Sequence, residues 1–141
     1  YYFDFAANRT EIEHDRFQMT PATTVVYALH KALEIIERQG LENLLADYRS
    51  YRDYLMEQLP ALGFRPVAEP GFAAPTVSAF WVPDGVSALE IMHRLRDEYN
   101  TAICTGFGPY LDKIIRIGHM GSVDMFDVRR VFHAIKDILG K

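Results

Sequence analysis

Residues 114–121 of this 141-residue chain read IIRIGHMG, a run of isoleucines that is interrupted by one arginine and followed by glycines. Isoleucines at this density are typical of a buried β-strand, and the side chains of a strand alternate between its two faces. We therefore predict that Ile115, Ile117 and His119 point to the same side of the strand, with Ile115 and Ile117 in the core. Arg116 should stand on the opposite face.

Arg116 is the candidate binding residue of this strand. We expect its guanidinium group to lie beside Gly118, which has no side chain and leaves space for a ligand. A guanidinium group can hold a carboxylate through two parallel hydrogen bonds, so a bound carboxylate would suit this space. The residues alone also allow a structural role, as a solvated arginine or as part of an internal ion pair.

Outside this strand, the sequence alternates between helical and strand patterns. Apolar residues at helical spacing predict helices, and short alternating runs of β-branched and aromatic residues predict strands. In chain order, the predicted elements are helices over 20–40 and 41–62, strands over 64–68 and 75–82, a helix over 87–99, strands over 101–105 and 114–117, and a helix over 122–139. This order predicts an α+β fold, with a small, mainly antiparallel sheet that carries helices on one face.

The first helix divides the chain. A hydroxyl followed by a proline is a common helix start, so Thr20 is predicted to cap this helix, and Gly40 is predicted to end it. Residues 1–19 show no helical period, and we predict that they form the end of another domain or a linker. Residues 20–40 would then be a bridging helix, and residues 41–141 a compact C-terminal domain.

The composition argues against several classes of function. A net charge of −4 disfavours nucleic-acid binding, which needs a basic patch. No apolar run is long enough to span a bilayer, and no signal peptide opens the chain, which begins with Tyr1. The single cysteine, Cys104, fits a reducing compartment, so we predict a cytoplasmic protein. The five histidines lack metal-ligand spacing, and we predict no metal site.

Several motifs, taken together, resemble one known family. The motifs are Thr20-Pro21 at a helix start, Gly40-Leu41-Glu42, Pro75-Thr76-Val77, Gly106-Phe107-Gly108-Pro109, and the stretch from Arg116 to Gly121. They resemble the C-terminal part of the class V pyridoxal-phosphate aminotransferases, in particular the alanine–glyoxylate and serine–pyruvate branch. The resemblance extends over nearly the whole chain, and it implies the C-terminal domain of a fold-type-I pyridoxal-phosphate enzyme.

The resemblance also implies an activity. The parent enzyme would be a homodimer that uses pyridoxal 5′-phosphate to transfer an amino group from alanine or serine to glyoxylate or pyruvate. Arg116 would bind the substrate carboxylate, and Thr20 would contact the cofactor phosphate of the partner subunit. The family's Schiff-base lysine would lie upstream of Tyr1. The chain would therefore hold no catalytic residue of its own and would be a fragment that is inactive alone.

Other residues are implied to line the site. Phe17 stands where some members of the family place a tyrosine that reaches the same phosphate. The remaining candidates for lining the site are Gly106, Gly108, Gly118 and His119.

Two alternatives stay open at this point. Cysteine desulfurases and selenocysteine lyases share the fold and carry a catalytic cysteine upstream of the same arginine, where this chain has Cys104. However, Cys104 follows the apolar residues Ala102 and Ile103, a pattern that predicts a buried, inert thiol. The second alternative is a stand-alone regulatory module that binds small carboxylates.

Overall fold

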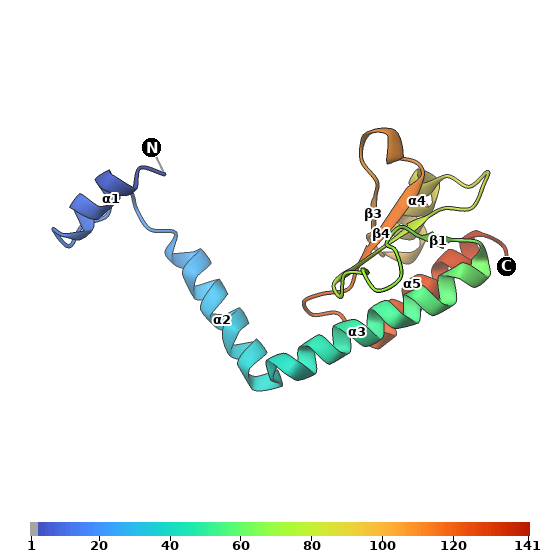
Figure 1. The fold of residues 1–141 in the computed structure, drawn as a ribbon, viewed down its shortest axis with the longest axis horizontal. Helices are drawn as coiled ribbons and strands as arrows, with labels where there is room; N and C mark the ends of the chain where they lie inside the picture. Colours follow the sequence, from blue (N-terminus) through green and yellow to red (C-terminus); the bar gives the residue numbers. More distant parts are fainter. Residues whose placement is uncertain (1–2) are drawn as a thin grey trace. The chain divides into compact units, whose positions relative to one another are not determined.

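The computed structural model describes residues 3–141 and divides into two compact units, one that ends at Leu41 and one that spans Glu42–Lys141 (Figure 1). The first unit contains helices α1 (Phe5–Ile12) and α2 (Thr23–Gln39). The later elements are α3 (Leu41–Gln58), the 3-10 helix η1 (Leu59–Leu62), β1 (Arg65–Pro66), β2 (Val77–Trp81), α4 (Ala88–Tyr99), β3 (Cys104–Thr105), the 3-10 helix η2 (Gly108–Tyr110), β4 (Ile114–Gly118) and α5 (Met125–Ile138).

Within residues 3–141, four short strands form one antiparallel sheet in the order β1-β2-β4-β3. The central strand β4 pairs with β2 on one side and with β3 on the other. Arg116 lies opposite Ala79 of β2 and opposite Cys104 of β3. Because residues directly opposite each other share a face of the sheet, these three side chains form one row.

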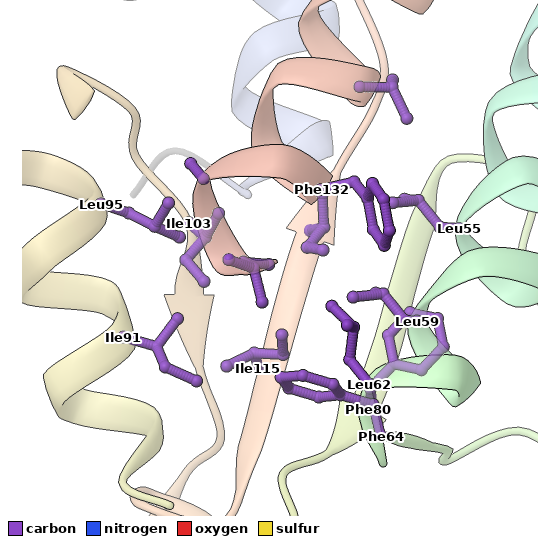
Figure 2. Packing of buried hydrophobic residues seen from close by; sticks show 14 of the residues in the cluster. Leu55, Leu59, Leu62, Phe64, Phe80, Ile91, Leu95, Ile103, Ile115 and Phe132 are labelled. Atoms are coloured by element: carbon purple, nitrogen blue, oxygen red, sulfur yellow. The ribbon is translucent and has the colours of Figure 1, made fainter. Parts of the chain in front are cut away.

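The core lies between the other face of the sheet and helices α3, α4 and α5 (Figure 2). Phe80 and Ile115, which pair across β2 and β4, are both fully buried. The helices contribute Leu55 from α3, Leu59 from η1, Ile91 and Leu95 from α4, and Phe132 and Ile135 from α5. Each such side chain contributes about 1.5–3 kcal/mol through burial. The predicted α+β fold, with helices on one face of an antiparallel sheet, is confirmed.

Helix α1 corrects the expectation that residues 1–19 form no helix. Asp4 caps this helix, since its side chain accepts a hydrogen bond of 3.0 Å from the amide of Ala7. The apolar residues of α1 do not gather on one face, and none of them is buried, so hydrophobic periodicity could not reveal it. Tyr1 and Tyr2, which open the predicted segment, lie outside the described residues.

Helix α2 also begins later than predicted. Its N-cap residue is Ala22, which has no side chain able to bond the helix amides. Thr20 lies outside the helix, so the prediction that it caps α2 was wrong. Gly40 does end the helix, as predicted: its φ of 84° lies in a region that glycine adopts without steric cost.

Candidate functional site

Arg116 stands on the face of the sheet opposite the helices. Its strand neighbours Ile115 and Ile117 are 0% and 2% exposed in the core, whereas Arg116 is half-buried. The alternation predicted for this strand is therefore confirmed. It leaves a permanently charged group at the surface of the sheet, beside Ala79 and Cys104.

Two contacts hold the guanidinium group. Its Nε–H donates a hydrogen bond of 2.8 Å to the backbone carbonyl of Thr105. Its central carbon lies 4.3 Å from the centre of the Phe107 ring, which is the geometry of a cation–π contact. Within residues 3–141, no carboxylate forms an ion pair with Arg116. The terminal edge of the guanidinium group therefore has no acidic partner, which disfavours the internal ion pair that the sequence left open.

The direction of the Arg116 side chain differs from the prediction. Thr105 pairs with Ile115, so the bond to its carbonyl draws the guanidinium group toward the start of β4. Gly118 lies at the other end of the strand. A Cβ atom placed on Gly118 would meet nothing within 4 Å, so the space exists as expected, but the guanidinium group leans away from it.

The loop after β3 brings Phe107 to Arg116. Gly106 is buried, and a Cβ atom there would lie only 2.3 Å from the carbonyl oxygen of Tyr110. Only glycine allows this close approach without a shift of the backbone. Gly108 follows with a φ of 53°, in the left-handed region that glycine favours. The two glycines thus shape the loop that carries Phe107.

His119 lies on the core side of the sheet, away from Arg116. It is fully buried, and its Nε2 lies 2.9 Å from Oγ of Ser78. Its backbone amide donates to the carbonyl of Thr76 at 2.9 Å, while its Nδ1 has no partner among the described residues. Burial lowers the pKa of His119, and the positive charge of Arg52 lowers it further. His119 is therefore a neutral core residue in this structure.

Cys104 corrects another expectation, since its side chain is exposed rather than buried. Ile103 faces the core at 8% exposure, so Cys104, one residue further along, faces the other way. The apolar neighbours that predicted burial thus occupy only one side of the strand. The thiol lies in the row of Arg116.

Thr20 and Phe17 belong to the first unit, whereas Arg116 and Phe107 belong to the second. Both Thr20 and Phe17 are exposed, and Phe17 is 70% accessible. Sequence reasoning placed Phe107 within a glycine loop but did not assign its ring a contact.

Residues 3–141 bring together no group of three or more histidine, cysteine, aspartate or glutamate side chains that could hold a metal ion. Among the helices of the same residues, none combines the length and the apolar character needed to cross a membrane.

Comparison with known proteins gives clear relatives, although no family model matches the chain. The chain is 32% identical over 125 residues to an alanine–glyoxylate aminotransferase of Felis catus, a match that covers 87% of the chain and 30% of the relative. It is 29% identical over 124 residues to a serine–glyoxylate aminotransferase of Methylorubrum extorquens, covering 87% of the chain and 31% of the relative.

The solved structures agree with these relatives. The alanine–glyoxylate aminotransferase of a Nostoc species superposes with a TM-score of 0.81 at 29% identity, covering 87% of this chain and 33% of that one. The fold is thus that of the C-terminal domain of a fold-type-I pyridoxal-phosphate enzyme. The chain belongs to the class V aminotransferase family, and it spans about a third of the length of the relatives it matches.

A more distant likeness bears on the desulfurase alternative. A NifS-like protein superposes with a TM-score of 0.64 at 19% identity, covering 78% of this chain and 31% of that one. At this identity the likeness shows the fold alone. Three relatives with 29–32% identity are named as aminotransferases or transaminases that act with glyoxylate.

Proposed function

We propose that this chain is the C-terminal part of a pyridoxal-phosphate-dependent aminotransferase that moves an amino group from alanine or serine to glyoxylate or pyruvate. The relatives support this activity, since several are alanine– or serine–glyoxylate aminotransferases. The observation that carries the proposal is the state of Arg116, which is anchored through Nε and has no acidic partner among residues 3–141.

Arg116 would bind the α-carboxylate common to all these substrates. With Nε bonded to Thr105, the two terminal nitrogens form the edge that can take a carboxylate through two parallel hydrogen bonds. A two-point grip fixes the orientation of the amino acid as well as its position. Orientation of this kind can supply several kcal/mol of barrier reduction.

The residues of this chain fit a contact with the cofactor phosphate. Thr20 is exposed two residues before Ala22, the N-cap of a 17-residue helix. The first amides of a helix lack partners and favour anions. We propose that Thr20 contacts the phosphate of pyridoxal 5′-phosphate across a homodimer interface and that Phe17 lies near it. When bound, this cofactor supplies an electron sink for the substrate, and the lysine that attaches it comes from another segment of the protein.

The surface of α2 supports a bridging role for residues 20–40. Val25, Leu29 and Leu33 recur on one side of this helix and are each more than half exposed. Apolar side chains gathered in this way favour contact with another part of the protein or with a second subunit. We propose that residues 1–19 form the end of another domain or a linker before this bridge and that residues 41–141 form the small domain.

The proposed location is the cytoplasm. Cys104 is a free, exposed thiol, and free thiols are stable in reducing compartments. Localisation of the tagged protein in its own cells, by fluorescence microscopy, would test this.

Variants of Arg116 in the complete protein test the proposed role. Arg116→Ala should lower kcat/KM for alanine by about a hundredfold or more. Arg116→Lys should also lose activity, because an ammonium group cannot form the two-point grip. Activity toward an amine without a carboxylate should change far less. Arg65→Lys is the matched control, since Arg65 also stacks on an aromatic ring, 5.4 Å from the centre of Trp81.

Two outcomes would overturn the proposal. Equal losses with amino acids and with the simple amine would make Arg116 a structural residue. Carboxylate binding through Arg116, without transfer of an amino group by the complete protein, would favour the regulatory module instead.

The desulfurase alternative keeps one observation in its favour, the exposed thiol of Cys104 opposite Arg116. A desulfurase would release sulfide from cysteine and lose this activity in Cys104→Ala. The proposed aminotransferase should keep most of its activity in the same variant.

A further inference from the structure

The ring of Phe107 contacts Arg116 although the fold does not require it there. Phe107 is 72% exposed and does not belong to the hydrophobic core. A large apolar side chain at this exposure gains little from burial. The contact that this ring makes is with the guanidinium group of Arg116.

We propose that Phe107 is a positioning residue that fixes the plane of the Arg116 guanidinium group and so aims its terminal nitrogens at the substrate carboxylate. This inference rests on the proposed role of Arg116. A carboxylate accepts two parallel hydrogen bonds only when it lies nearly in the plane of the guanidinium group. The direction of that plane therefore decides the direction from which substrate can bind.

Two different contacts are needed to fix a plane. The hydrogen bond from Nε to the carbonyl of Thr105 holds one edge at 2.8 Å, but a single bond lets the group swing about it. The central carbon of the guanidinium group lies over the Phe107 ring, 4.3 Å from its centre. Together, the two contacts restrain the group at Nε and at its central carbon, and they leave the terminal nitrogens for the substrate.

The loop holds Phe107 by its backbone rather than by burial of its ring. The carbonyl of Phe107 accepts a hydrogen bond of 3.0 Å from the amide of Tyr110. Gly106, which has no side chain, allows the loop to pass close to the backbone of Tyr110. The ring of Tyr110 in turn packs edge-on against Trp81 of β2, with ring centres 5.5 Å apart. The ring of Phe107 is thus carried on a loop that is tied to the sheet at both ends.

Variants of Phe107 in the complete protein test this role. Phe107→Ala should lower kcat/KM for alanine roughly threefold to tenfold, through loss of the cation–π contact and of orientation. Phe107→Tyr should restore it to within about twofold, because a tyrosine ring stacks equally well. Activity toward an amine without a carboxylate should not change. Phe126→Ala is the matched control, since Phe126 is a phenylalanine of α5 with 71% exposure.

A second measurement follows Arg116 itself and needs no enzymatic activity. An arginine-selective dicarbonyl reagent should modify Arg116 roughly threefold to tenfold faster in Phe107→Ala, because the ring no longer covers one face of the group. Mass spectrometry of the digested protein gives the rate at this residue. Phe107→Tyr and Phe126→Ala should react at the original rate.

The outcomes separate this inference from the proposed function. If Arg116→Ala abolishes turnover of alanine while Phe107→Ala changes neither turnover nor reagent rate, the positioning role is wrong and the carboxylate site stands. Equal losses with alanine and with the simple amine would also reject it, as a purely structural effect. If Arg116→Ala leaves turnover unchanged, the proposed function fails, and the reagent rate alone decides whether Phe107 holds the guanidinium group.

Discussion

Oγ of Ser78 lies 2.9 Å from Nε2 of His119, and both side chains are completely buried. Ser78 belongs to β2, so this contact joins β2 to the turn that follows the arginine strand. The same turn is held from α3, where the hydroxyl of Tyr48 accepts a hydrogen bond of 2.8 Å from the amide of Gly121. The exit of β4 is therefore fixed by two elements that are distant in sequence.

His119 should make the protein less stable in mild acid. Burial lowers its pKa below the ordinary value of 6.5, so the unfolded chain takes up a proton at a pH where the folded chain does not. The stability that the neutral ring contributes is complete above that ordinary value and is lost as the pH falls below it. The loss should reach at most roughly 1.4 kcal/mol per pH unit, the limit for one proton. Urea unfolding at a series of pH values measures it.

The variant His119→Gln tests this assignment, since glutamine can still hydrogen-bond Ser78 but does not titrate. Its stability should depend less on pH just below neutrality than that of the unchanged protein. If the free energy of unfolding depends equally on pH in the two proteins, a group other than His119 causes the loss of stability in acid. A nuclear magnetic resonance titration of the His119 ring gives the same answer if the variant does not fold.

The two glycines near Arg116 should respond differently to alanine. Gly106→Ala should cost about 1–3 kcal/mol of unfolding free energy, because its Cβ meets the backbone of Tyr110. Gly118→Ala should change stability by less than about 0.5 kcal/mol, since its Cβ enters open space. Chemical denaturation of both variants checks the contrast.

Gly118→Ala should also leave the affinity for amino acids unchanged, because the Arg116 guanidinium group leans toward Thr105. A large loss of substrate affinity in this stable variant would instead restore the placement expected from the sequence. The carboxylate would then lie over Gly118.

Thr20→Ala should separate cofactor binding from helix stability. The N-cap residue of α2 is Ala22, so removal of the Thr20 hydroxyl should change stability by less than about 0.5 kcal/mol. Affinity for pyridoxal phosphate in the complete protein should fall by roughly 1.5–3 kcal/mol, the value of one hydrogen bond to a charged group. Titration followed by absorbance measures this affinity.

Thr10→Ala is a suitable control in the same unit, because its hydroxyl bonds the carbonyl of Ala6 within α1. It should leave cofactor affinity unchanged. Equal cofactor affinity in Thr20→Ala and in the unchanged protein would remove Thr20 from the phosphate site.

The sequence predicted the features that depend on periodicity. Ile115 and Ile117 defined a strand with one buried face, and this alone placed Arg116 opposite the core. Helix α1 was missed because it has an N-cap at Asp4 but no apolar face. The start of α2 was misplaced because a threonine before a proline can cap a helix, but the helix need not begin at that threonine.

The contacts of the site depend on tertiary structure and could not be read from the sequence. A glycine-rich loop before the arginine strand was visible, but its path depends on the approach of Gly106 to Tyr110. The stacking of Phe107 on Arg116 follows from that path. The direction in which Arg116 leans depends on a carbonyl of a neighbouring strand, Thr105, which no local pattern specifies.

The row formed by Ala79, Arg116 and Cys104 gives the site a natural place for a reporter group. Cys104 is the only cysteine in the chain, and its thiol is exposed directly across from Arg116. A small fluorine-containing tag would therefore attach at one position only, next to the guanidinium group. Its resonance would shift when a carboxylate reaches Arg116, so ligand binding can be followed at this one position without any catalytic turnover.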